Sequence, residues 1–438
     1  MMDKIIHDKC IGVIKDAIKS EHKESEHKVY AYLDEINIDE TGDNSYLSFS
    51  LITEKILDFD VEYRTVTGYR PFFLSYVATE NIKAFVKKYE ESVKENEQLD
   101  YVDRWFEISF SDKEPATPIF EFEGYVEYSA SPIKYIQKRL KIIATSIPND
   151  VKEKINKTYS VSTTDNGDVD DIFRGVFGGA SYKKARVYNV GHGNFITVNG
   201  KKGKDRFSFI YDIGTHRGRF GAMKTKYSRA KHAIAGCIPN AVILSHWDSD
   251  HIMGVVFAKD IIFEKKWFAP DVNDSGTNAK RLACFLDYKG VLVMVEKNDF
   301  ARVISETDIM KLMMGKNKST NHITKVNCSG LAFKITTTNN NKKVSRFMGD
   351  VPYAALVDAS GNNLMKDDIK KNDNLVMPHH GRKMSTDRVD DYHTRGAYGF
   401  AIYSNSNEET LHPQDLKKTY NYKVECTKDY PLCCEIDL

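Results

Sequence analysis

The sequence contains no long hydrophobic run and no paired-cysteine motif. Every apolar stretch falls short of the roughly 20 residues that a membrane-spanning helix needs. The first 20 residues mix acids with short apolar runs, so we expect no secretory signal. The seven cysteines include no CxxC pair. We therefore expect neither a disulfide scaffold nor a zinc finger, and a reducing cytoplasm is the simplest setting.

Internal repeats and low-complexity segments are also missing from the sequence. The chain has 438 residues, of which 41% are hydrophobic and 29% are charged. This length and composition are typical of a globular chain with two or three domains.

The net charge of +1 hides an uneven distribution. Residues 1–180 hold 23 Lys and Arg against 34 Asp and Glu, a balance of −11; residues 181–438 hold the remaining 40 and 28, a balance of +12. Such opposed halves suggest two domains that have different partners or that attract each other, although surfaces of one protein can also simply differ in charge.

The first half, residues 1–180, is predicted to be a small acidic α+β domain of unknown role. We find no catalytic motif in it, and binding of a partner protein is one role that we consider. Its apolar periodicity predicts strands at 29–33, 45–52, 61–66, 106–110 and 118–130, and helices at 1–20, 84–102 and 131–147.

The polar, glycine-containing segment 159–184 is the predicted linker, and we place the domain boundary near residue 180. After it, short strands are predicted at 185–190, 194–200, 206–214 and 240–246. The last of these is almost wholly apolar and ends in His246, which is typical of a strand buried on both faces in a layered α/β domain.

Four potential metal ligands directly follow this strand within six residues: His246, Asp248, Asp250 and His251. Two imidazoles and two carboxylates suit a pair of divalent metal ions. Further ligand-type residues follow later apolar segments, and these are Asp350, His379, His380 and His412. The alternative, a solvated polar loop, does not account for this ordered series.

The series resembles the metallo-β-lactamase-fold hydrolases, and in particular the ComEC type attached to bacterial DNA-uptake channels. That type reads roughly DVGQGDA, LIDTG, HPDADHIGG, NNNS, GD, PHHG and HP. The corresponding segments here are NVGHGNF (189–195), IYDIG (210–214), HWDSDHIMG (246–254), NCS (327–329), GD (349–350), PHHG (378–381) and HP (412–413).

The resemblance implies an αββα metallo-β-lactamase sandwich over residues 181–438, with two divalent metals at one edge. His246 and Asp248 would hold one metal, and Asp250 and His251 the other. Asp350 would bridge the two.

By the same resemblance, His379 or His380 would complete the second metal site. His412 would orient the substrate or pass a proton. Most members have a histidine where this chain has Asp248, and the harder carboxylate ligand favours Mn²⁺ over Zn²⁺.

The opening motif departs from the family pattern, because Asn189 and Asn194 stand where acids are usual and His192 stands where glutamine is usual. His192 is a possible substrate contact, although it also suits an ordinary turn in a glycine-rich loop.

No acid occurs between Asp212 and Asp248, and basic residues fill the interval. Cations with interleaved aromatic residues suit phosphate contacts and base stacking, although a solvated surface would have the same composition. The predicted nucleic-acid contacts are Arg217, Arg219, Lys224 and Lys226.

The sequence therefore predicts a two-metal phosphodiester hydrolase, with Asp250 and His412 in catalytic roles. We expect a nuclease acting on DNA, in defence or nucleic-acid processing. The alternatives are a phosphodiesterase for a small phosphoester, and a catalytically silent metal-binding scaffold whose N-terminal domain binds a partner. Trp267-Phe268 and Cys433-Cys434 are predicted to lie in core strands.

Overall fold

The computed structural model describes most of the chain. The predicted helices at 1–20 and 84–102 lie outside the described part. No described helix is both long and apolar enough to cross a membrane. The described residues are 29–37, 46–65, 73–78, 105–109, 120–129, 138–190, 193–215, 230–316, 327–337, 343–365, 373–377, 399–403, 422–430 and 432–438.

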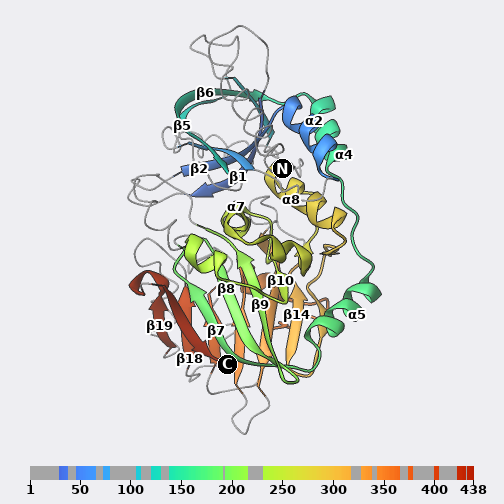
Figure 1. Ribbon diagram of the computed structural model, residues 1–438, viewed down its shortest axis with the longest axis vertical. Coiled ribbons are helices and arrows are strands. Elements are labelled where there is room, and N and C mark those ends of the chain that lie inside the picture. Colours follow the sequence, from blue (N-terminus) through green and yellow to red (C-terminus); the bar gives the residue numbers. More distant parts are fainter. Residues whose placement is uncertain are drawn as a thin grey trace. The chain divides into compact units, whose positions relative to one another are not determined.

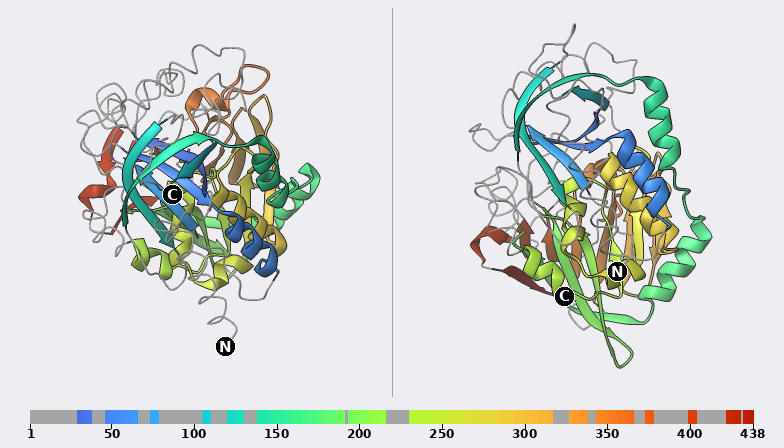
Figure 2. Two further views of the ribbon diagram at one scale, coloured as in Figure 1. Left: turned by 90° about the horizontal axis from the view of Figure 1, so that it is seen from above. Right: turned by 45° about the horizontal axis from the view of Figure 1, so that its top comes forward.

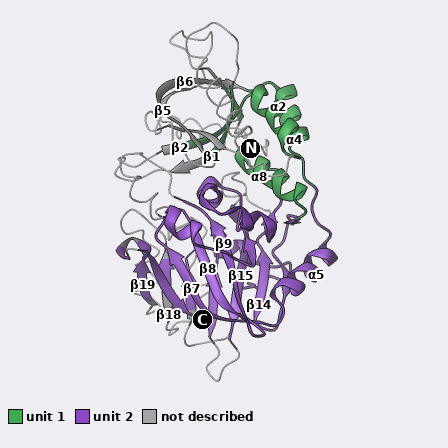
Figure 3. Cartoon of the chain, in the orientation of Figure 1, with its two compact units in different colours: residues 1–161, 218–221, 272–290 green, residues 162–217, 222–271, 291–438 purple. Residues whose placement is uncertain are grey.

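The chain divides into two compact units, which Figure 3 distinguishes by colour. Unit 1 comprises residues 1–161, 218–221 and 272–290, and unit 2 comprises residues 162–217, 222–271 and 291–438. The first division falls at 161/162, earlier than the boundary expected near residue 180. The expected second domain, 181–438, also gives up an internal segment, 272–290, to unit 1.

Unit 1 contains a closed antiparallel barrel, with the strand order β1-β2-β3-β5-β6-β4 (Figure 1). Its interior includes Leu33, Phe49 and Phe106, and the rings of the last two meet edge to face at 5.9 Å. The strands are β1 (Val29–Asn37), β2 (Tyr46–Ile52), β3 (Phe73–Ala78), β4 (Trp105–Ser109), β5 (Phe120–Ser129) and β6 (Lys138–Ser146).

Two predictions for unit 1 are wrong. The predicted strand at 61–66 overlaps helix α2 (Glu54–Tyr63), which begins because Thr53 Oγ1 accepts a hydrogen bond from the Ile56 amide. The predicted helix at 131–147 overlaps strand β6. Antiparallel pairing with both β5 and β4 decides the outcome.

Helix α8 (Thr277–Tyr288) is held in unit 1 by a buried ion pair, although its sequence lies between two strands of unit 2. Arg281 binds the Asp60 carboxylate through Nε and, at 3.0 Å, through its terminal nitrogen. Tyr159 Oη donates to the same carboxylate at 2.7 Å. Asp60 lies on α2, which packs beside α4 (Asn149–Thr158) (Figure 2).

Unit 2 contains two seven-stranded mixed sheets, with the orders β12-β11-β10-β9-β8-β7-β20 and β13-β14-β15-β16-β17-β18-β19. In the first sheet β9, β10, β11 and β12 are parallel, and in the second β16, β17, β18 and β19 are parallel. The first sheet consists of β7 (Ala180–Tyr188), β8 (Phe195–Lys202), β9 (Asp205–Ile213), β10 (Ala241–Ile243), β11 (Lys266–Pro270), β12 (Leu292–Val295) and β20 (Cys433–Asp437).

The two sheets pack face to face through a shared apolar core (Figure 1). Tyr211 of β9 meets Phe333 of β15 edge to face at 4.9 Å, and Phe333 stacks on Phe347 of β16 at 4.4 Å. The predicted α/β fold class is confirmed. The second sheet consists of β13 (Arg302–Glu306), β14 (Met310–Met314), β15 (Leu331–Thr336), β16 (Val344–Phe347), β17 (Asp373–Val376), β18 (Gly399–Tyr403) and β19 (Tyr422–Cys426).

The predicted linker at 159–184 is wrong, because it contains helix α5 (Asn166–Phe177). Asp165 caps the helix by accepting from the Gly167 amide at 2.8 Å. Val169, Phe173 and Phe177 follow one another at four-residue spacing and enter the sandwich core. The predicted core strands are confirmed, since Trp267 and Phe268 are buried in β11 and Cys434 is buried in β20.

Replacing Arg281 with alanine should lower the free energy of unfolding by about 3–5 kcal/mol, because Asp60 would stay buried without its cationic partner. Urea unfolding of the full chain measures the change. The matched control is Lys184→Ala, which breaks an exposed ion pair with Glu435 and should leave the transition nearly unchanged. Equal effects of the two substitutions would contradict the anchoring role of the buried pair.

Candidate metal centre

The residues of the predicted metal site lie at strand ends in unit 2. His246 follows β10, and Asp250 and His251 lie on the short helix α7 (Ser249–Ile252) that comes next. Asp350 follows β16 of the opposite sheet. Because the carboxyl ends of neighbouring parallel strands meet at one edge of a sheet, this edge is where a site is expected.

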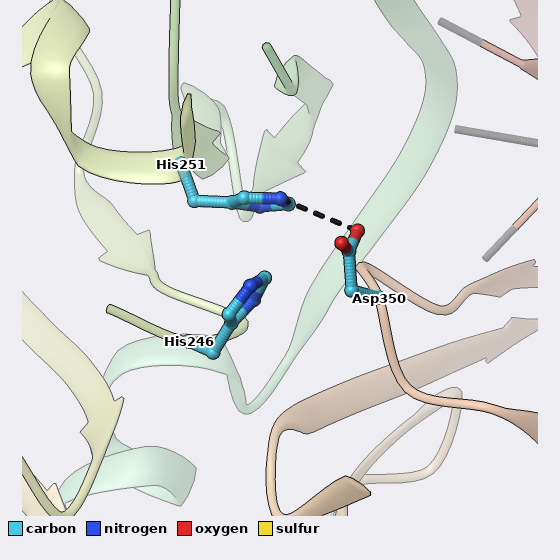
Figure 4. A group of neighbouring side chains, drawn as sticks. All are labelled: His246, His251 and Asp350. Atoms are coloured by element: carbon cyan, nitrogen blue, oxygen red, sulfur yellow. Dashed lines mark ion pairs between the residues drawn. The ribbon is translucent and has the colours of Figure 1, made fainter. Parts of the chain in front are cut away.

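His246, His251 and Asp350 form a buried cluster, which Figure 4 shows. One potential ligand atom from each lies within 4.8 Å of the others. His251 Nε2 lies 3.3 Å from Asp350 Oδ1, and the two imidazole centroids are 4.0 Å apart. The donor atoms of three residues from two sheets therefore converge on one small volume.

Two further carboxylates lie beside the cluster. Asp248 Oδ2 is 3.4 Å from His246 Nε2, and Asp250 Oδ2 is 3.6 Å from His251 Nε2. Asp248 occupies the N-cap position of α7 without its side chain capping the helix, and that side chain is partly exposed. Its carboxylate is therefore available to bind a metal ion or to be hydrated by solvent.

Asp212, at the end of β9, accepts hydrogen bonds from residues that hold the cluster in position. Its fully buried carboxylate accepts from the Ser245 amide at 2.6 Å and from Ser245 Oγ at 2.8 Å. It also lies 2.8 Å from both Asn194 Nδ2 and His251 Nδ1. Among the described residues, Asp212 is the only non-glycine residue with a positive φ, 56°. Such strained backbone persists only where surrounding contacts over-determine it.

The same network determines which imidazole nitrogens face the cluster. Ser245 Oγ donates its hydrogen bond to Asp212, so its lone pairs accept a hydrogen bond from His246 Nδ1, 3.0 Å away. Asp212 likewise accepts a hydrogen bond from Nδ1 of His251. In the neutral form of each ring, Nε2 is then the unprotonated atom, and Nε2 is the atom that lies near the carboxylates.

The carboxylates also change the acidity of both histidines. Burial lowers the pKa of His251, but nearby carboxylates outweigh it and raise that pKa well above its ordinary value. These carboxylates belong to Asp250, Asp350 and Asp212. Burial and the neighbouring His251 lower the pKa of His246, and carboxylates again raise it overall. The cluster thus favours positive charge at its centre, as protons or as a bound cation.

The residues fit a divalent metal ion. His246 Nε2 is buried and makes no hydrogen bond to any other described residue. The nitrogen and carboxylate donors around it are those that Zn²⁺ and Mn²⁺ accept. The orientation of His251 by a carboxylate on its other nitrogen is a common arrangement around metal-binding histidines.

Glycine permits the close approach of the two sheets at this point. Gly349, immediately before Asp350, has φ 55°, and a Cβ there would lie 2.4 Å from Ser245 Cβ. The Ser245 carbonyl accepts from the Leu331 amide at 2.7 Å, and Tyr211 Oη donates to the Leu331 carbonyl at 2.8 Å. The site therefore lies where the two sheets are joined by direct hydrogen bonds.

The structure brings together His246, His251 and Asp350, with Asp248 and Asp250 beside them. The other predicted site residues lie outside the described part of the chain, and their roles stay predictions. These residues are His192, Arg217, Arg219, Lys224, Lys226, His379, His380 and His412.

Sequence reasoning assigned no site role to Asp212 or Ser245. One signal was available for Asp212, because it is the only acid in the otherwise apolar strand end Phe209–Ile213. Asn194 was treated as a departure from the family pattern, and its amide proves to donate to Asp212.

No protein-family model matches the chain, and no curated protein matches it. Among solved structures, it is similar to the metallo-β-lactamase fold protein YhfI from Bacillus subtilis, with 13% identity and a TM-score of 0.33 over 59% of this chain and 100% of that chain. It is also similar to a mutant of the CmlA β-hydroxylase, with 10% identity and a TM-score of 0.32 over 72% and 69% of the two chains.

Replacing Gly349 with alanine should destabilise the protein by more than the same change at Gly203. Both glycines have positive φ, but a Cβ at Gly203 would meet nothing within 4 Å. We expect about 1–2 kcal/mol for Gly203→Ala from backbone strain, and about 1–3 kcal/mol more for Gly349→Ala from crowding against Ser245. Denaturant unfolding of both variants checks this difference, and equal losses would refute the close sheet contact.

Proposed function

We propose that the chain is a divalent-metal-dependent phosphodiester hydrolase and that its substrate is DNA. The observation that carries the proposal is the buried convergence of His246, His251 and Asp350, with two further carboxylates beside them. A structural polar cluster would have its donors and acceptors satisfied internally, whereas the buried His246 Nε2 makes no hydrogen bond to another described residue.

The metal ligands in this proposal are His246, Asp248, Asp250, His251 and Asp350, with His379 or His380 completing the set. Bound divalent ions would activate water and neutralise charge that develops on a phosphoryl group. The chain's own contribution is to keep the ligands in position. Asp212 and Ser245 hold both imidazoles with Nε2 towards the cluster. His412 is proposed to orient the substrate or transfer a proton.

The choice of DNA rests on charge. The proposed contacts are Arg217, Arg219, Lys224 and Lys226, in a stretch that has no acid between Asp212 and Asp248. This stretch follows β9 in the chain, and β9 ends beside the cluster at Asp212. Cations that follow a strand ending beside the cluster suit a polyanionic substrate.

Asp350→Asn should abolish metal-dependent hydrolysis of a small phosphodiester such as bis-nitrophenyl phosphate, with a loss of at least about 100-fold. Even residues that only orient a metal ligand are worth about 10–100-fold in metal affinity or activity, and a ligand should matter more. The assay uses chelator-treated protein to which Mn²⁺, Zn²⁺ or Mg²⁺ is returned, and bound metal is measured by elemental analysis.

The matched control for this experiment is Asp205→Asn. Asp205 is exposed at the opposite end of β9 from Asp212, about 23 Å away at the usual strand rise, and should keep wild-type metal content and rate. If the wild-type protein binds none of the three metals, or if folded Asp350→Asn protein keeps its rate, the proposed function is wrong.

Neutralising Arg217, Arg219, Lys224 and Lys226 together with glutamine should raise KM for DNA and leave hydrolysis of the small phosphodiester unchanged. The log–log dependence of DNA binding on salt should flatten by about 0.7–0.9 for each cation that no longer neutralises a phosphate. Kinetics at several salt concentrations measure both effects. An equal loss on the two substrates would mean that this stretch shapes the site, and no cleavage of DNA by the wild-type protein would favour a small phosphoester as substrate.

A further inference from the structure

Trp247 lies between His246 and Asp248 in the ligand segment, but its side chain makes its hydrogen bond to a neighbouring strand of unit 2. The residue is buried, and its indole Nε1 donates a 2.6 Å hydrogen bond to the carbonyl of Pro270. Pro270 is the last residue of β11, the neighbour of β10 in the sheet. Since His246 and Asp248 flank Trp247 directly, the position of this indole constrains both of their backbones.

Pro270 lies at the point where the chain leaves unit 2. Residues 272–290 belong to unit 1, and the chain returns to unit 2 at Val291, just before β12. Asp271, the last residue before this segment, is held in the sheet because its amide donates a hydrogen bond to the Val295 carbonyl of β12 at 2.9 Å. Segment 272–290 is therefore flanked by two adjacent strands, β11 before it and β12 after it.

We infer that Trp247 is a positioning residue that ties the metal-ligand segment to Pro270 at the end of β11, and that this hydrogen bond keeps His246 and Asp248 in place for metal binding. The inference rests on the proposed function in one respect, namely that residues 246–251 bind metal. Displacements of a supporting residue of about 1 Å are enough to loosen such a site. Pro270 is a firm anchor because β11 pairs with both β10 and β12 in the sheet.

The first test compares two substitutions of buried tryptophans by phenylalanine. Trp247→Phe removes the indole donor to Pro270. Trp267→Phe, on β11, removes an equivalent donor, whose acceptor is the Ile262 carbonyl at 3.0 Å, and is the matched control. We expect Trp247→Phe to weaken Mn²⁺ binding about 10-fold by calorimetric titration, and Trp267→Phe to leave it within about 2-fold.

A second readout needs no metal. The His251 amide donates to the Asp248 carbonyl at 2.9 Å, so its hydrogen exchange reports the order of the ligand segment. Exchange should accelerate in metal-free Trp247→Phe and stay unchanged in Trp267→Phe. On the small phosphodiester at saturating Mn²⁺, Trp247→Phe should lower kcat and leave KM unchanged. Equal effects of the two substitutions on metal affinity and exchange would overturn the inference.

The outcomes also separate this inference from the proposed function. Absence of Mn²⁺ or Zn²⁺ binding by the wild-type protein would refute the proposed function. Normal metal binding and hydrolysis by the wild type, with Trp247→Phe unchanged in affinity and exchange, would leave the function intact and refute only the positioning role.

Discussion

The buried carboxylate of Asp212 is the constraint on which the centre of unit 2 depends. A buried carboxylate is costly unless hydrogen bonds replace the water that it loses. Here the donors come from Asn194 just before β8, from the residues after β10, and from α7, so satisfying one charge fixes three separate segments. The positive φ of Asp212 is tolerated because these contacts over-determine its position.

Hydrogen bonds to this carboxylate also fix the positions of the proposed ligands. Ser245 and His251 are held directly, and His246 is held through Ser245. Asp350 comes from the other sheet, which approaches closely only because residue 349 is glycine. The candidate metal centre is thus a consequence of how two sheets meet, and a substitution far from the candidate ligands can alter it.

Unit 1 is discontinuous in sequence. Residues 272–290 belong to it, and there Arg281 neutralises a carboxylate that would otherwise be buried alone. That carboxylate belongs to Asp60, more than two hundred residues earlier in the sequence. A boundary drawn from composition cannot detect such an exchange, because the pairing partners are distant in sequence and each looks like an ordinary surface charge.

The local sequence pattern was sufficient where the spacing of apolar residues agreed with their burial. It predicted β7, β8, β9, β10, β11 and β20 of the first sheet, and the order of His246, Asp250, His251 and Asp350. It failed at β6, where long-range pairing overrides an ambiguous pattern. It also failed at α5, where many polar residues made a helix look like a linker although its apolar side enters the core. The sequence by itself therefore determined the types and order of the candidate ligands. Only the tertiary structure decided that Asp212 orients them and that α8 belongs to unit 1, because both depend on charges that become partners only after distant segments fold together.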